Sequence, residues 1–134
     1  MARTAGIILI GNEILSGKVV DANAVYLCRE FRALGVDVRK ISVIPDDVEL
    51  IAREVREFQP SYDWVFTSGG VGPTHDDVTI EGVARGLGVR VVRDPGLQTR
   101  LEEAFSGKPK LSIRLVWMPP GATAFTRTPR SMYS

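Results

Sequence analysis

Apolar residues along this chain fall into two periodic patterns that alternate with each other. Gly6 to Ile10 is a continuous apolar run, which is typical of a strand buried on both faces of a parallel sheet. Residues 36–44 alternate between apolar and polar positions, and residues 64–67 and 89–92 are shorter apolar runs. These patterns predict four strands, and residues 113–118 are a weaker candidate for a fifth.

The segments between these strands carry apolar residues at helical spacing. Asp21 is the expected N-cap of the first helix and Gly35 its stop, while Pro45-Asp46-Asp47 opens the second helix and Pro60 closes it. Gly88 is the expected stop of the third helix. Within the first helix we expect Cys28 to be a small buried side chain. The predicted helices cover residues 21–34, 48–58, 78–87 and 95–105.

Strands that alternate with helices of this length require right-handed crossover connections and a mostly parallel sheet. The expected fold class is therefore α/β, with three α/β/α layers and helices on both faces of the sheet. The 134 residues fit a single domain over residues 1–134, because no repeat or linker interrupts the pattern.

Charge and composition narrow the classes of partner. Lys and Arg number 17 and Asp and Glu number 16, so the net charge is +1 and we expect neither nucleic acid nor a membrane as a partner. The single cysteine excludes an internal disulfide. The first apolar run is too short for a signal peptide core or a membrane span, so a cytoplasmic protein is the simplest interpretation.

The segment from Ser68 to Asp77 carries the clearest chemistry. In open parallel sheets, ligands bind outside the carboxyl ends of the strands, where this segment and Gly11-Asn12-Glu13 both fall. Its glycines allow positive φ and let backbone N–H groups approach a phosphate. Two adjacent carboxylates would repel a phosphate alone, whereas Mg²⁺ bridges carboxylates and phosphate oxygens. The glycines are Gly69, Gly70 and Gly72, and the carboxylates are Asp76 and Asp77.

Simpler interpretations of this segment remain open. The glycines alone are compatible with a tight turn, and one of the two aspartates could cap the following helix. His75 is the only histidine and a candidate general acid or base, although a structural hydrogen bond is the alternative. A Rossmann site is excluded because no Gly-x-Gly-x-x-Gly follows the first strand, and a P-loop because no Gly-Lys-Ser/Thr occurs.

At this point the motifs resemble a known family. Residues 68–79 read Ser-Gly-Gly-Val-Gly-Pro-Thr-His-Asp-Asp-Val-Thr, and residues 11–17 and 21–23 read Gly-Asn-Glu-Ile-Leu-Ser-Gly and Asp-Ala-Asn. These motifs are similar to those of the molybdopterin-binding (MoaB/Mog-like) domain, in the branch found at the N-terminus of CinA proteins and in eukaryotic FAD synthases. The resemblance covers about residues 5–122.

The resemblance implies roles for individual residues. Asp77 matches an acidic residue that the molybdenum-cofactor enzymes use with Mg²⁺, and Asp76 is a second carboxylate typical of the CinA-like branch. Both are the expected metal ligands and, with His75, the expected catalytic residues. The expected ligand-binding residues are Gly11, Asn12, Glu13, Asp21, Asn23, Ser68, Gly69, Gly70, Gly72, Thr74, Thr79 and Glu81.

The resemblance also implies an activity. The chemistry of the CinA-like branch is hydrolysis of a pyrophosphate bond in ADP-ribose or FAD, so we expect a Mg²⁺-dependent nucleotide pyrophosphatase. One alternative is molybdopterin binding in molybdenum cofactor biosynthesis, without turnover. Another is a degenerate domain that serves assembly. Relatives that form dimers or trimers imply a homo-oligomer.

The C-terminal region departs from the family pattern. After a segment like residues 115–122, the family continues into an Asn-Pro-x-Gly-Thr-Ala-Pro-Gly stretch that supplies a second ligand-facing loop. Here residues 125–130 contain no glycine. We therefore expect a domain that is shortened at its C-terminus, which bears on catalysis more than on the fold.

Overall fold

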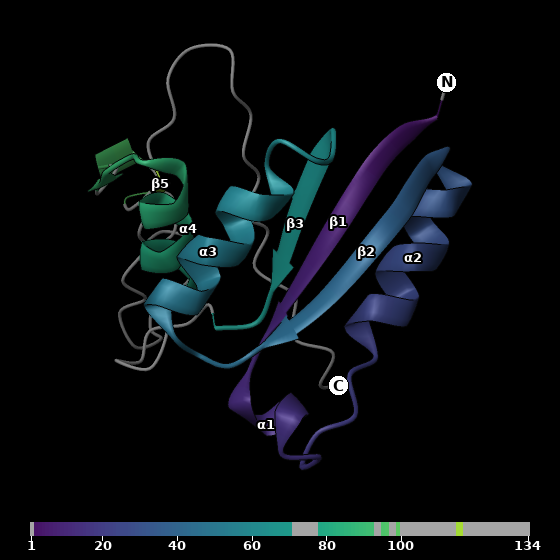
Figure 1. Ribbon diagram of the computed structural model, residues 1–134, viewed down its shortest axis with the longest axis horizontal. Coiled ribbons are helices and arrows are strands. Elements are labelled where there is room, and N and C mark those ends of the chain that lie inside the picture. The colour runs from purple at the N-terminus through teal and green to yellow at the C-terminus, as the bar shows by residue number, and fades with distance from the viewer. Residues whose placement is uncertain (1, 71–77, 93–94, 97–98, 100–114, 117–134) are drawn as a thin grey trace.

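A parallel sheet of three strands, in the order β2-β1-β3, organises the structure (Figure 1). β1 (Arg3–Ile10) lies in the middle, and β2 (Val36–Ile44) and β3 (Trp64–Ser68) pair with it on either side. The structure is a computed structural model that describes residues 2–70, 78–92, 95–96, 99 and 115–116. The first three predicted strands are confirmed, and β1 begins before the expected Gly6.

Helices cover both faces of this sheet, which confirms the three expected layers. α2 (Asn23–Ala33) packs along β2, and the ring centroids of Phe31 on α2 and Phe66 on β3 are 4.3 Å apart. On the opposite face lies α3 (Val48–Phe58), with α4 (Thr79–Leu87) packed against it (Figure 1). In the part of the chain that the structure describes, no helix has the length and apolar character needed to cross a membrane.

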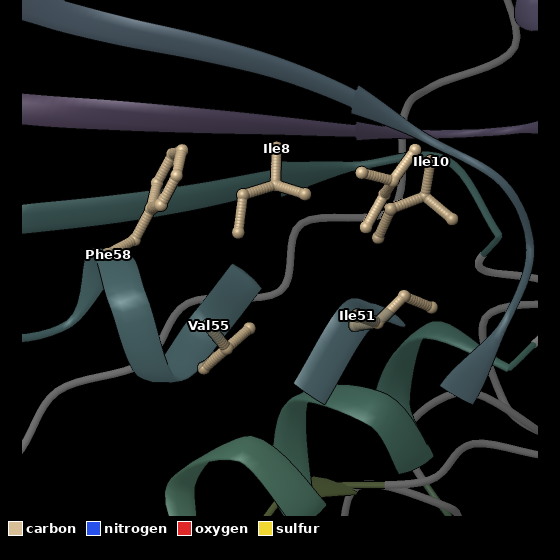
Figure 2. Close-up of a cluster of buried hydrophobic side chains, with 6 residues drawn as sticks. Ile8, Ile10, Ile51, Val55 and Phe58 are labelled. Carbon is tan, nitrogen blue, oxygen red and sulfur yellow. The ribbon is translucent and has the colours of Figure 1, made fainter. Parts of the chain in front are cut away.

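The main apolar core lies between the sheet and α3 (Figure 2). Ile8 and Ile10 of β1 meet Ile51, Val55 and Phe58 of α3, and none of these five side chains is more than 3% exposed. The α3 positions are spaced by three or four residues, so they form a single stripe on the helix. Burying an apolar side chain of this size contributes about 1.5–3 kcal/mol.

The helix ends follow the residues that the sequence predicted. The Asp47 carboxylate accepts the Leu50 N–H at 2.9 Å and caps α3. Asp21 accepts the N–H groups of Asn23 and Ala24 at 3.2 and 3.0 Å, so it caps α2 although it stands two residues before the helix. Gly35 and Gly88 end α2 and α4 with φ of 76° and 67°, in the left-handed region.

A bulge in β2 accounts for a slip in its apolar pattern. The pairing with β1 shifts by one residue, because Val38 pairs with Ala5 whereas Lys40 pairs with Gly6. The alternation of apolar and polar residues in β2 also shifts by one residue at this point. The extra residue, Arg39, therefore keeps the apolar side chains before and after the bulge on one face of the sheet. By the register, that face is the one on which Ala5, Ile7 and Leu9 of β1 stand. The four positions are Val36, Val38, Ile41 and Val43.

Residues 89–92 differ from the prediction. β4 (Val91–Val92) does not join the parallel sheet but pairs antiparallel with β5 (Leu115–Val116) in a separate two-stranded sheet. Directly after Gly88, the Val89 N–H donates to the Ala84 carbonyl at 2.9 Å. This bond holds the start of the segment that leads to β4 against the last turn of α4. β5 falls within the fifth predicted strand. Of the predicted helix 95–105, residues 95, 96 and 99 are described, and they are helical.

The structure also differs from the sequence in two helical segments. α1 (Asn12–Leu15) is a four-residue helix that the apolar pattern did not predict. In α2 no residue is fully buried: Cys28 is half-buried and Val25 is 54% exposed, and Leu34, directly after the helix, is 77% exposed. The expectation of a buried Cys28 is wrong, because α2 lies along β2, which is an edge strand of the sheet. Part of the apolar side of α2 is therefore open to solvent.

Candidate functional site

The carboxyl ends of the three parallel strands bring three loops together. The loop after β1 begins at Gly11, the loop after β2 contains Pro45-Asp46-Asp47, and the loop after β3 begins with Gly69-Gly70. The Gly11 N–H donates to the carbonyl of Ile44 at 3.0 Å, which fixes the first loop against the end of β2. The parallel sheet thus places the first sequence motif and the described start of the second, Ser68-Gly69-Gly70, at one edge, as predicted.

The first two loops are joined by a reciprocal pair of hydrogen bonds. The Asn12 N–H donates to Asp46 Oδ2 at 2.9 Å, and the Asp46 N–H donates to Asn12 Oδ1 at 3.2 Å. Each residue therefore satisfies a backbone donor of the other, over a separation of 34 positions in the chain. This pair holds the start of α1 next to the end of β2.

The third loop makes a turn that only glycine fits. Gly69 and Gly70 have φ of 95° and 61°, in the region where a side chain is strained. A Cβ on Gly69 would collide with the carbonyl oxygen of Ile10, and one on Gly70 would collide with Thr79 Oγ1. The turn therefore packs closely against both the end of β1 and the start of α4.

Thr79 fixes this turn through two hydrogen bonds. Its side chain is 1% exposed, and its Oγ1 donates to the Gly69 carbonyl at 2.8 Å. Its backbone N–H also donates to the Gly70 carbonyl at 3.4 Å. Two successive carbonyls of the turn are thus held by the first residue of α4, a residue that was predicted to bind the ligand.

A further contact ties the start of α2 to the end of β3. Asn23 Nδ2 donates to Ser68 Oγ at 3.2 Å, so two predicted site residues that stand 45 positions apart lie next to each other. Asp21, a third predicted residue, uses its carboxylate to cap α2. These contacts extend the site from the glycine turn toward the N-terminus of α2.

The two predicted glutamates lie in different surroundings. The Glu13 side chain folds back over Gly11, and a Cβ built on Gly11 would lie 2.6 Å from Glu13 Oε1. Its carboxylate is therefore at the first loop of the site. Glu81 instead accepts from Arg85 Nη2 at 3.1 Å on the exposed side of α4, and Arg85 also pairs with Glu49 of α3.

The structure brings one unpredicted residue into the site. Asp46 Oδ1 would lie 3.2 Å from a Cβ on Gly70, so this carboxylate stands beside the glycine turn as well as bonding Asn12. In the sequence, Asp46 was interpreted only as part of a helix opening. The signal that could have identified it is its place directly after β2, because all three parallel strands end at the same edge of the sheet.

The remaining predicted residues lie outside the described part of the chain, and their roles stay predictions. Within the described ranges, no three His, Cys, Asp or Glu side chains gather closely enough to hold a metal ion. The five residues are Gly72, Thr74, His75, Asp76 and Asp77.

A cavity of about 730 Å³ lies away from these loops, between α2 and β2. Cys28 and Arg32 of α2 line it, together with residues 35–41 and Ala2. It contains none of the predicted site residues, because it opens along the outer strand rather than at the carboxyl ends of the sheet.

Comparison with known proteins identifies the family to which this sequence is similar. The sequence profile of a family described as a probable molybdopterin binding domain matches residues 6–128. The chain is 55% identical to a probable FAD synthase of Caenorhabditis elegans over 82 residues, which cover 61% of this chain and 16% of that protein. The chain spans less than half the length of this relative and of three other curated relatives that it matches.

Solved structures share the fold. A structure of the protein CinA from Thermoplasma acidophilum, described as having unknown function, superposes with a TM-score of 0.73 at 34% sequence identity, over 78% of this chain and 62% of that one. A tungsten cofactor synthesizing protein MoaB from Pyrococcus furiosus superposes with a TM-score of 0.59 at 21% identity, over 78% of this chain and 65% of that one. The second likeness concerns the fold alone.

Proposed function

Because the chain belongs to the family of probable molybdopterin binding domains, we propose that its strand-end site binds a nucleotide pyrophosphate with Mg²⁺ and hydrolyses it. ADP-ribose and FAD are the proposed substrates. The observation that carries the proposal is the position of the Asp46 carboxylate beside the Gly69-Gly70 turn. A carboxylate next to a turn of this kind suits a metal-bridged phosphate better than a bare anion.

The oxygen donors at this site fit Mg²⁺, which prefers one or two carboxylates and phosphate oxygens. Asp46 Oδ1 lies at the turn, and Asp76 and Asp77, which follow the turn in the sequence, would hold the ion with it. When bound, Mg²⁺ would polarise a phosphoryl oxygen and neutralise its charge. The N–H groups of the turn and of the first turn of α4 would bind the other phosphate oxygens.

Hydrolysis needs one water for each substrate. The water oxygen bonds to one phosphorus, the bond from that phosphorus to the bridging oxygen breaks, and the second phosphate leaves with the bridging oxygen. His75 is the proposed base that takes the proton of the water. ADP-ribose would give AMP and ribose 5-phosphate, and FAD would give AMP and FMN.

The proposal is tested by measuring AMP release from ADP-ribose and from FAD, with Mg²⁺ and with excess chelator. We expect release only with the metal, and a loss of about 100-fold or more in Asp77→Ala. Asp37→Ala is the matched control, because it removes the same charge from an exposed residue whose ion pair among the described residues is with Arg39, at 2.7 Å. Equal release by wild type and Asp77→Ala would refute the proposal.

Molybdopterin binding without turnover is the second candidate, and the description of the family favours it. Calorimetry with molybdopterin and with ADP-ribose separates the two. Binding of the pterin without AMP release would support this candidate, whereas nucleotide binding without pterin binding would count against it. Normal hydrolysis would also exclude the degenerate assembly domain.

The proposed setting is a cytoplasmic homo-oligomer, a dimer or a trimer. Sedimentation of the purified chain at several concentrations tests the assembly, and a monomer at all concentrations would refute it.

A further inference from the structure

Thr79 is buried, and its hydroxyl proton is used in a hydrogen bond within the protein. The side chain is 1% exposed, and Oγ1 lies 2.8 Å from the Gly69 carbonyl, to which it donates. A ligand outside the turn cannot reach a hydroxyl that is covered in this way. We propose that Thr79 is a positioning residue that turns the Gly70 N–H toward the bound ligand, rather than a residue that contacts the ligand.

The geometry of one peptide group carries this proposal. The Gly69 carbonyl and the Gly70 N–H belong to the same planar trans peptide, so they point in opposite directions. Thr79 holds the carbonyl on the buried side of the turn, and the N–H is therefore directed away from Thr79. No acceptor among the described residues receives this N–H.

The turn depends on Thr79 because glycine does not hold its own conformation. Both glycines have positive φ and no side chain, so a free Gly69-Gly70 peptide could rotate at little cost. The hydroxyl and the backbone N–H of Thr79 fix two consecutive carbonyls and remove that freedom. A donor that is oriented before binding suits an anionic oxygen of a phosphate, because no ordering is needed when the ligand arrives.

The first experiment measures the orientation of the Gly70 N–H in the full chain. Residual dipolar couplings are compared in wild type, Thr79→Val and Thr79→Ser. Valine keeps the shape of threonine without the hydroxyl, and serine keeps the hydroxyl. Thr4→Val is the control, because it removes a threonine hydroxyl that donates to Asp63 at 3.0 Å at the opposite end of the sheet.

We expect the Gly70 coupling to change in Thr79→Val and to stay as in wild type in Thr79→Ser and Thr4→Val. A folded Thr79→Val protein with an unchanged coupling would overturn the proposal, whether or not a ligand binds. Amide exchange in wild type covers the case in which Thr79→Val does not fold. Strong protection of the Gly70 amide would show that it is already bonded within the protein, which would also overturn the proposal.

The second experiment measures binding, and it rests on the proposed function. Calorimetry with inorganic pyrophosphate and Mg²⁺ should show about tenfold weaker binding in Thr79→Val, and wild-type affinity in Thr79→Ser and Thr4→Val. Equal affinity in Thr79→Val and wild type would overturn the role of Thr79 and leave the proposed function standing. A wild type that binds neither pyrophosphate nor ADP-ribose nor FAD would refute the proposed function, and the dipolar couplings would then decide the role of Thr79.

Discussion

Asn12 and Asp46 bond each other through their backbones and side chains, at 2.9 and 3.2 Å, and so connect the ends of β1 and β2. The same Asp46 carboxylate stands beside Gly70 at the end of β3. One side chain thus relates all three strand ends, and the shape of the site depends on a residue from outside both sequence motifs.

Replacing this carboxylate should weaken the fold and the site together. We expect Asp46→Ala to lower the free energy of unfolding by about 1–2 kcal/mol, since the Asn12 N–H loses its acceptor while the backbone bond from residue 46 to Asn12 Oδ1 is kept. Asp46→Asn keeps a side-chain oxygen for this N–H and should lose less than half as much. Urea unfolding measures both, with Asp37→Ala as the exposed control. Equal losses in the Ala and Asn variants would contradict the bridging role.

The close contact of α3 with α4 should make Gly82 intolerant of a side chain. A Cβ at this position would lie 2.6 Å from the Cβ of Ile51, and overpacking of this kind costs about 1–3 kcal/mol. Alanine gains up to about 1 kcal/mol in helix propensity, so we expect Gly82→Ala to be destabilising by up to about 2 kcal/mol.

A double-mutant cycle with Ile51→Ala tests the cause of this loss. The smaller side chain makes room, so the loss from Gly82→Ala should shrink in the Ile51→Ala background. Additive losses would indicate that the contact with Ile51 is not responsible.

Stability should depend on pH through Asp63. Hydrogen bonds from the Thr4 N–H and hydroxyl, and to a smaller extent the Arg3 guanidinium, lower the pKa of the Asp63 carboxyl. Since the folded pKa lies below the unfolded value, the contribution is present above about pH 4 and is lost as the pH falls through the folded pKa.

Urea unfolding at neutral and acid pH measures this effect. Wild type should lose more stability on acidification than Asp63→Asn, and Thr4→Val should lie between them because one of the donors is gone. Parallel pH profiles for wild type and Asp63→Asn would rule out Asp63 as a source of the acid sensitivity.

The end of α4 should require a residue that accepts positive φ. Gly88 has φ of 67°, and a Cβ built on it would meet nothing within 4 Å. We therefore expect Gly88→Ala to cost about 1 kcal/mol through backbone strain alone, and Gly88→Asn to cost less, because asparagine tolerates this region. Thermal unfolding compares the two, and a smaller loss for alanine than for asparagine would contradict this explanation.

Local patterns predicted the elements that local forces determine. The apolar stripe of Ile51, Val55 and Phe58 indicated α3, and Asp47 and Gly88 indicated helix ends, because each signal lies within a few residues of its effect. The first motif and the start of the second, Ser68-Gly69-Gly70, were also correctly placed at one edge of the sheet, since the carboxyl ends of parallel strands meet there.

What the sequence did not predict depends on distant partners. Asp46 joins the site through residues far from it in the chain, and the antiparallel pairing of β4 with β5 joins residues more than twenty positions apart. The exposure of Cys28 depends on how much of the sheet α2 covers. No spacing within α2 contains that information.

The bulge in β2 has a consequence for changes in chain length. Removing one residue from an ordinary strand turns every following side chain to the wrong face. Removing Arg39 would instead leave Val36, Val38, Ile41 and Val43 in strict alternation, with no bulge and no side chain displaced from its face. This outer strand therefore contains a position where sequences can differ in length by one residue while the sheet keeps both of its surfaces.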